Sequence, residues 1–122
     1  MRPFAFPGAN ANKFRNKKIT VDGILFDSKK EAGIYQELKL LRASGELKEF
    51  ERQVKFELIP SQKDEAGKVI ERAVTYTADF VVSYPDGEVV VIDAKGNRAL
   101  DAKYPIKRKM MLYFHKIRIK EI

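Results

Sequence analysis

The stretch VVVIDAKG, residues 89–96, restricts the fold of this 122-residue chain more than any other segment. Successive side chains of a strand point to opposite faces, so Val89 and Val91 cover one face. Val90 and Ile92 cover the other. Apolar residues on both faces indicate a strand that lies between two layers of the protein.

Charged residues end this strand. Asp93 and Lys95 are two residues apart, so they point to the same face and are both partly removed from water. Burying either charge without a partner would cost several kcal/mol. Two interpretations are open: a structural ion pair at the end of a strand, or a pair of charges kept for chemistry.

The composition narrows the class of protein. With 44% hydrophobic residues, the chain has enough apolar material for one modest core, and we expect a single domain over residues 17–122. It has no cysteine, which excludes disulfides and thiol nucleophiles and favours a cytoplasmic location. No apolar run approaches the roughly 20 residues of a membrane span, so we expect no membrane partner. Any bound metal is expected to have oxygen ligands.

The net charge of +7 is unevenly distributed. Residues 1–18 hold five basic residues and no acidic one, and residues 95–122 hold nine basic residues against two acidic ones. We expect residues 1–16 to form a basic flexible arm, and Lys17 and Lys18 at its end to contact nucleic acid. The alternative is ordinary solubilising charge.

Hydrophobic periodicity and turn signals predict one series of elements. In order, they are a small hairpin at 19–26, a helix between Ser28 and Gly45, antiparallel strands at 47–59, at 69–84 and from Val89, a helix from about Asp101 or Lys103, and a strand at 116–122. The polar segment at 61–68 is expected to be a turn.

Two apolar faces follow from this assignment. Alternation in the strand at 69–84 predicts one continuous face, made of Val74, Tyr76, Ala78, Phe80, Val82 and Tyr84. The predicted apolar stripe of the second helix consists of Ile106, Met110, Tyr113 and Phe114.

Three carboxylates occupy informative positions. Glu31 begins the apolar face of the first helix, although its spacing from Ser28 is also that of a helix capping box. Asp79 and Asp93 lie seven and six residues from the turn at Asp86-Gly87, so we expect them to face each other, about 5 Å apart.

Two ionised carboxylates at that separation would repel by about 3 kcal/mol at an effective dielectric constant near 20. A divalent cation reverses the sign of this interaction, and Mg²⁺ and Mn²⁺ prefer oxygen ligands. We therefore expect a Mg²⁺ site, in which Mn²⁺ substitutes, formed by Glu31, Asp79 and Asp93. The backbone carbonyl of Ala94 is a further candidate ligand.

Glu31, the Asp79 of TADF, and Asp93-Ala94-Lys95 together resemble the D-(D/E)-x-K signature of the restriction-endonuclease-like, or PD-(D/E)xK, nucleases. The predicted element order is similar to their core. More narrowly, KKITVDGILFDSKKEAGIYQELKLL, QVKFELIP and YTADFVV resemble small phage and prophage nucleases akin to Holliday junction resolvases. The resemblance covers about residues 19–122. Asp93 stands where Glu is frequent, and Ala78 stands where Pro is frequent.

The resemblance implies an α/β (α+β) fold with an αβββαβ core, in which a mixed central sheet is flanked by helices and preceded by a small hairpin. It implies phosphodiester hydrolysis in which Asp79 and Asp93 bind the metal. Glu31 would bind it too or orient a water on it. Lys95 would position the attacking water or stabilise charge on the phosphate.

Further residues are candidates for DNA contacts. Gln53 lies on a strand that faces the same region, although a surface glutamine is the simpler interpretation. Lys103, Lys107 and Arg108 lie on the helix after the active strand, where a solvated basic face is the alternative.

We therefore expect a metal-dependent endodeoxyribonuclease of a bacterial or phage-infected cell, with DNA and no small molecule as its substrate. A domain of this size has little room for a separate sequence reader, so branched DNA is the expected target. Symmetric cutting of two strands would require a homodimer. The alternatives are a sequence-dependent or nicking nuclease with the same core, and a non-catalytic DNA-binding module. An RNA-binding module is disfavoured because no strand interleaves exposed aromatic and basic residues.

Overall fold

The computed structural model describes residues 17–94 and 102–122. The expected arm at 1–16 and Lys95 lie outside these described residues. The elements in chain order are β1 (Ile19–Val21), β2 (Ile24–Phe26), α1 (Lys29–Ala43), β3 (Glu49–Ile59), β4 (Gln62–Lys63), β5 (Val69–Glu71), β6 (Val74–Ser83), β7 (Val89–Asp93), α2 (Tyr104–Met110), the π-helical turn η2 (Met111–His115) and β8 (Lys120–Glu121).

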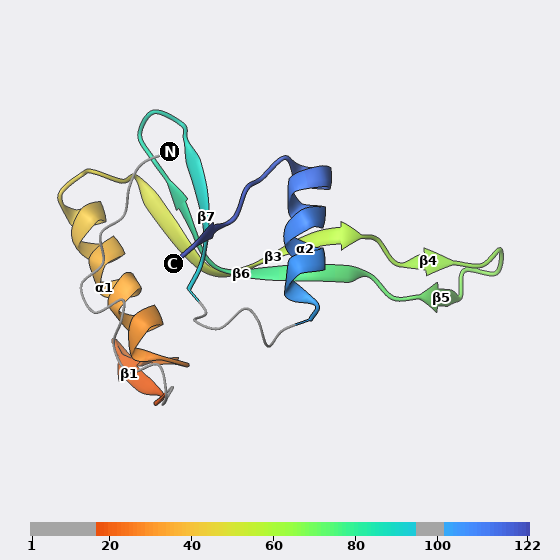
Figure 1. The fold of residues 1–122 in the computed structure, drawn as a ribbon, viewed down its shortest axis with the longest axis horizontal. Coiled ribbons are helices and arrows are strands. Elements are labelled where there is room, and N and C mark those ends of the chain that lie inside the picture. Colours follow the sequence, from red (N-terminus) through yellow and green to blue (C-terminus); the bar gives the residue numbers. More distant parts are fainter. Residues whose placement is uncertain (1–16, 95–101) are drawn as a thin grey trace.

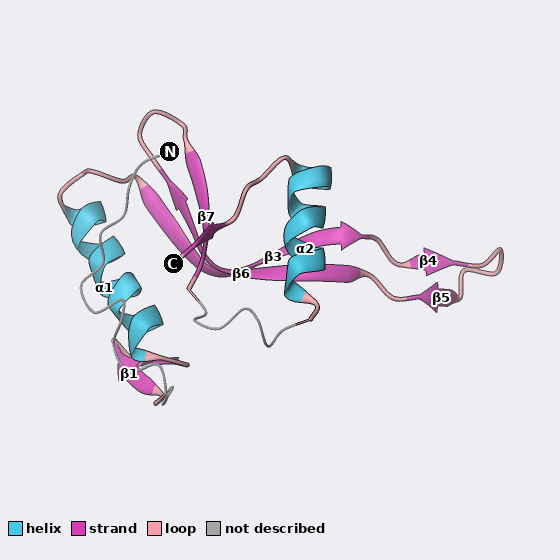
Figure 2. Ribbon diagram, in the orientation of Figure 1, coloured by secondary structure: helices cyan, strands magenta, loops and turns pink. Residues whose placement is uncertain are grey.

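A four-stranded mixed sheet forms the centre of the fold, with the strand order β3-β6-β7-β8 (Figure 1). The β3–β6 and β6–β7 pairs are antiparallel, whereas β7 and β8 are parallel. Parallel pairing needs a crossover, and the segment that contains α2 provides it. The expected α+β class, with a mixed sheet and two helices, is confirmed (Figure 2).

The small hairpin β1–β2 turns at Asp22-Gly23, as predicted. Both residues have positive φ angles, 54° and 76°, which is the conformation of a type I′ turn. The Asp22 carboxylate accepts hydrogen bonds from Tyr35 and Lys39 of α1. The side-chain hydrogen bond from Lys39, followed by that from Tyr35, lowers the pKa of Asp22. These contacts attach the hairpin to the first helix.

Helix α1 begins and ends where the sequence predicts. The side chain of Ser28, the N-cap, accepts a hydrogen bond from the backbone N–H of Glu31 at 3.1 Å. Gly45 follows the helix with a φ of 84°, a left-handed conformation that glycine adopts without steric cost. Glu31, Ile34 and Leu38 form the buried face of the helix.

The apolar core has two parts, one on each face of the sheet. The α1-side core includes Phe26, Ile34, Leu38, Leu47, Phe50, Phe80, Val82, Val90 and Ile92. The α2-side core includes Leu58, Tyr76, Ala78, Val91, Tyr104, Met111 and Ile119. On the short strand β7, Val91 points to one core and its neighbours point to the other, so the helices cover opposite faces.

Strands β3 and β6 each contribute residues to both cores. On β6, Phe80 packs in the α1-side core, whereas Ala78, two residues earlier, packs in the α2-side core. Phe50 and Leu58 of β3 are divided in the same way. The predicted apolar residues from Tyr76 to Tyr84 are all buried, but they are divided between two cores, where the prediction placed them on one continuous face.

A two-stranded arm projects from the far end of β3 and β6 (Figure 1). Strands β4 and β5 form it, and the Asp64 side chain accepts hydrogen bonds from the backbone N–H groups of Ala66 and Lys68 in its turn. The segment at 61–68 is thus a strand and a turn, where we predicted only a turn. The predicted strand at 69–84 is divided into β5 and β6.

The second helix faces the sheet differently from the prediction. Tyr104 and Met111 are its buried residues, whereas Ile106, Tyr113 and Phe114 of the predicted stripe are exposed. The final strand covers only Lys120–Glu121 of the predicted 116–122. Neither helix in the described ranges, 17–94 and 102–122, is long and apolar enough to cross a membrane.

Replacing Ser28 by alanine removes the side-chain acceptor at the start of α1. We expect a loss of about 1 kcal/mol of unfolding free energy and a fall in melting temperature of about 4 °C. Differential scanning calorimetry would measure both. The exposed Ser61 provides a matched control, and an equal effect of Ser61→Ala would contradict the capping role.

Candidate functional site

Three carboxylates are buried where the sheet meets the start of α1. Glu31, Asp79 and Asp93 are 4%, 2% and 3% exposed, and they are the buried charged residues among those that the structure describes. We call these three residues the acidic row. Acidic side chains are seldom buried so deeply unless they have partners, so the row is the candidate functional site.

The elements place the members of the row at defined points. Glu31 lies in the first turn of α1, Asp79 in the middle of β6, and Asp93 at the end of β7. The β6–β7 register pairs Phe80 with Ile92, so Asp79 and Asp93 occupy the next opposed positions, as predicted.

Gln53 joins two members of the row. Its side-chain amide donates hydrogen bonds to Glu31 Oε1 at 3.2 Å and to Asp79 Oδ1 at 3.4 Å. Arg52 pairs with Phe80 across the two strands, so Gln53 lies opposite Asp79. Gln53 was a candidate for DNA contacts; the structure places its amide on the acids.

The backbone of Gln53 is unusual for a strand. Its φ is 52°, in the left-handed region that side chains other than glycine seldom adopt. Gln53 lies opposite Asp79, at the position where the buried residues of the two strands pass from one core to the other. The irregular backbone and the buried acid therefore occur at one cross-strand position.

The two aspartates of the sheet, Asp79 and Asp93, accept further hydrogen bonds. Asp79 Oδ2 accepts the backbone N–H of Ala94 at 2.7 Å, which ties β6 to the end of β7. Asp93 Oδ2 accepts the hydroxyl of Tyr76 at 2.9 Å. Burial, followed by the nearby Asp93 charge, raises the pKa of Tyr76 well above its usual range, so this hydroxyl stays a donor.

Glu31 takes part in the N-terminal cap of α1 through its backbone and in the site through its side chain. Its N–H is bonded to Ser28, whereas its side chain faces Gln53 and lies 3.9 Å from the Arg52 guanidinium. Arg52 also stacks over Phe26, with its guanidinium carbon 4.6 Å from the ring centroid. The capping spacing and the site role therefore coexist, because backbone and side chain serve different contacts.

A second group of polar contacts connects Asp93 to α2. Glu121 of β8 is in register with Asp93. Its carboxylate accepts the Tyr104 hydroxyl and lies 3.6 Å from Arg108 Nη1. The Tyr104 ring is 6.4 Å from that of Tyr76, the donor to Asp93.

Sequence reasoning missed the site contacts of Arg52, Tyr76 and Glu121. The parallel register that places Glu121 beside Asp93 has no local signal in the sequence. The role of Tyr76 had a signal in the sequence. It lies three residues before Asp79 on the same predicted strand, close to the partner strand that carries Asp93.

The basic candidates lie on the surface. Lys17 and Lys18 are exposed directly before β1, and Lys103 is exposed directly before α2. Lys107 is half-buried, and Arg108 is exposed and lies beside Glu121. The structure thus brings Arg108 into the group of contacts that leads to Asp93.

The row is not drawn together around a single point. Within residues 17–94 and 102–122, no group of three or more Asp, Glu or His side chains is arranged to hold a metal ion. Glu31 and Asp79 share the Gln53 amide, and Asp93 is bound to Tyr76. Lys95 lies outside the described part of the chain. The expected metal site and the role of Lys95 stay predictions.

Residues 11–122 match a family described as "Protein of unknown function (DUF1064)". The match covers most of the chain, so this protein belongs to that family. No curated protein is similar enough in sequence to count as a match. The family description gives no activity.

The left-handed conformation of Gln53 predicts a reversal of the usual order of substitutions. In an ordinary strand, glycine is less stable than alanine by about 0.5–1 kcal/mol. At position 53 we expect Gln53→Gly to be more stable than Gln53→Ala by about 1 kcal/mol, because only alanine keeps the steric cost. Guanidinium unfolding would measure the difference.

Lys55, an exposed residue two positions further along β3, is the matched control. There the ordinary order should hold, with Lys55→Ala more stable than Lys55→Gly. The same order at both positions would show that Gln53 carries no left-handed strain.

Proposed function

We propose that this protein is a metal-dependent endodeoxyribonuclease with a core of the PD-(D/E)xK type, and that Mg²⁺, or Mn²⁺ in its place, binds at the acidic row. The proposed substrate is DNA, in particular branched DNA. Cleavage of two strands of a junction would be carried out by a homodimer.

The observation that carries this proposal is the burial of three carboxylates from three elements at one end of the β6–β7 hairpin. Removing a carboxylate from water is costly, and three neighbouring ones repel each other as well. A stable apolar core has no need of such a group. A site that binds a hard divalent cation does need it.

The residues present fit Mg²⁺ in their chemistry. All three are oxygen donors, and a carboxylate offers about four lone-pair positions, so a donor that orients it does not prevent metal binding. When bound, Mg²⁺ would polarise the phosphate and make bound water more acidic. The proposal requires the ion to draw Glu31, Asp79 and Asp93 closer together.

The protein's own groups have separate roles in this proposal. Gln53 and the Ala94 N–H hold the Asp79 carboxylate in place, and Tyr76 holds that of Asp93. Lys95 would position the attacking water or stabilise the charge that develops on the phosphate. Lys103 and Arg108, near the start of α2, are suited to contact neighbouring phosphates.

One observation favours the non-catalytic alternative. Each member of the acidic row already contacts a protein donor, and hydrogen-bonded acids can be purely structural. On this alternative the protein binds DNA through its basic surfaces and does not cleave it.

The deciding experiment compares Asp79→Asn and Asp93→Asn with the unchanged protein on four-way junction, flap and linear duplex DNA. With Mg²⁺ or Mn²⁺ we expect the unchanged protein to cut the branched DNA and EDTA to abolish cutting. Each variant should lose about 100-fold or more in rate, because a metal ligand contributes several kcal/mol of transition-state stabilisation.

Glu65→Gln makes the same chemical change at an exposed residue in the turn of the arm and should cut normally. Calorimetric titration with Mn²⁺ provides a second readout, in which both aspartate variants should bind more weakly. Tight DNA binding without cleavage, and with metal affinity unchanged in the variants, would favour the non-catalytic module.

A further inference from the structure

The end of the second helix exposes aromatic side chains. Tyr113 and Phe114 of η2 are 70% and 51% exposed. Their rings contact each other edge to face, with centroids 5.0 Å apart. Free exposure of two adjacent rings is unfavourable in water, so this surface is suited to a partner that has a flat apolar face.

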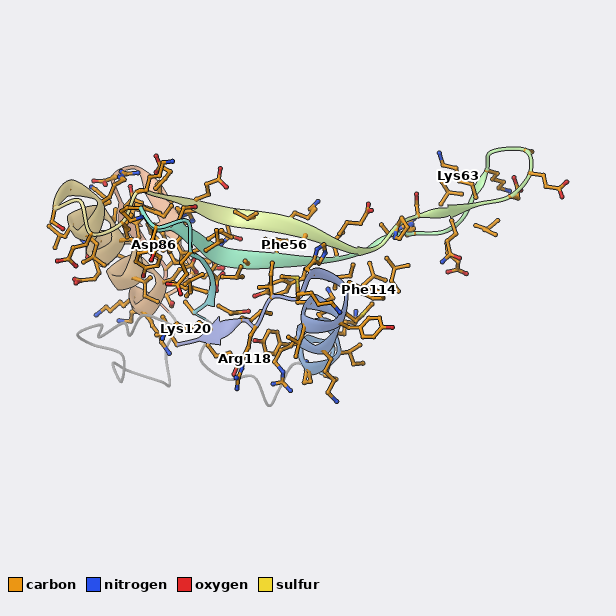
Figure 3. The ribbon with its side chains drawn as sticks, turned by 90° about the horizontal axis from the view of Figure 1, so that it is seen from above. Phe56, Lys63, Asp86, Phe114, Arg118 and Lys120 are labelled. Atoms are coloured by element: carbon orange, nitrogen blue, oxygen red, sulfur yellow. The ribbon has the colours of Figure 1, made fainter. Side chains whose placement is uncertain are left out.

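Basic residues precede and follow these rings in the chain, and Lys116 lies over the Tyr113 ring. Residues 102–122 contain one acidic residue, Glu121, which lies beside Arg108, and the following basic residues: Lys103, Lys107, Arg108, Lys109, Lys116, Arg118 and Lys120. Figure 3 shows Phe114 on one side of the helix and, on the other side, Arg118 on the segment that leads into β8 and Lys120 in β8 itself. We call residues 103–120 of this region the aromatic–basic surface. Its charge complements a polyanion.

The rings are held on a rigid support. Lys116 ends the helix with a φ of 60°, donates to the Tyr113 carbonyl at 2.9 Å, and places its ammonium 5.3 Å from the Tyr113 ring centroid. His115 Nε2 contacts the Glu57 carbonyl at 2.7 Å, which attaches the helix end to β3. A fixed aromatic platform loses little side-chain entropy on binding.

We infer that the aromatic–basic surface binds unpaired nucleotides of the DNA substrate, with bases stacked on Tyr113 and Phe114 and phosphates near the surrounding lysines. This inference rests on the proposed nuclease function and specifies its substrate: DNA that carries a single-stranded segment next to a duplex. Aromatic platforms inside basic grooves are the usual means of binding single strands without sequence preference.

The helix also sets the distance between the platform and the site. Tyr104, whose ring is 6.4 Å from that of Tyr76, lies nine residues before Tyr113. At 1.5 Å per residue this is about 13 Å. A stacked strand advances 3.4 Å per nucleotide, so this length of helix corresponds to about four nucleotides between Tyr104 and the platform.

A second copy of this chain is a less suitable occupant of the surface. Two copies that met through this surface would bring two strongly basic patches together, and the repulsion would oppose the apolar contact. DNA reduces this charge on binding, and its bases cover the rings.

The test compares Tyr113→Ala/Phe114→Ala with the unchanged protein and with Leu40→Ala, which removes a similarly exposed apolar side chain, 66% exposed, from α1. Fluorescence anisotropy in EDTA would measure binding to a blunt duplex and to the same duplex with a single-stranded flap of about six nucleotides. EDTA separates binding from cleavage.

We expect the double variant to lose about tenfold or more in affinity for the flap DNA, since each stacked base contributes about 1–3 kcal/mol. Its affinity for blunt duplex should stay nearly unchanged, and so should both affinities of Leu40→Ala. A fluorescent base analogue about four nucleotides into the flap should be quenched by the unchanged protein only.

Equal losses on both DNAs, or no loss on either, would overturn the inference. So would a change of the double variant from dimer to monomer in light scattering, because the rings would then belong to a protein interface. Loss of flap preference in a protein that never cuts DNA would refute the nuclease proposal and leave the stacking surface intact.

Discussion

The contact of the Gln53 amide with Asp79 lies at the point on which the geometry of this fold depends. The buried apolar residues are even-numbered along the whole of β3 and β6, but they are divided between the two cores at this cross-strand position, so one long hairpin serves both cores. Asp79 is buried between Ala78 and Phe80, each of which packs in a different core. The irregular Gln53 backbone thus accompanies both the division of the core and the burial of the acid.

Three neutral donors contact the acidic row in the described part of the chain. An amide, a backbone N–H and a phenol satisfy carboxylate lone pairs without cancelling their charge. Arg52 is a charged contact of Glu31, at 3.9 Å and partly exposed, where the attraction is modest. The three carboxylates of the row lie in a site shielded from water. Such a site attracts a divalent cation more strongly than the same acids would on the surface.

Local signals in the sequence were sufficient for much of the fold. The Asp22-Gly23 turn, the Ser28 cap and the opposed positions of Asp79 and Asp93 all depend on neighbours within a few residues or on one hairpin. The left-handed backbone at Gln53 was not predictable, because glutamine, unlike glycine or asparagine, does not signal this conformation. In the second helix, residues 110–114 are apolar without interruption, so periodicity could not show that Met111 is the buried one. Register effects, such as Glu121 beside Asp93, arise only when the sheet is assembled.

The pairing of β8 with β7 relates the position of the basic helix to the acidic row. The backbone N–H of Ile122 donates to the Asp93 carbonyl at 3.0 Å, which holds the end of the chain against the strand that carries the acid. Glu121, in the same short strand, binds the Tyr104 hydroxyl and lies beside Arg108. A shift of one register position in β8 would turn Glu121 to the opposite face and remove both contacts from α2. Because the same helix continues into Tyr113 and Phe114, this short parallel pairing controls how far the exposed rings lie from Asp93. The two-residue strand β8 thereby connects the strand that carries Asp93 to the helix that carries the exposed rings.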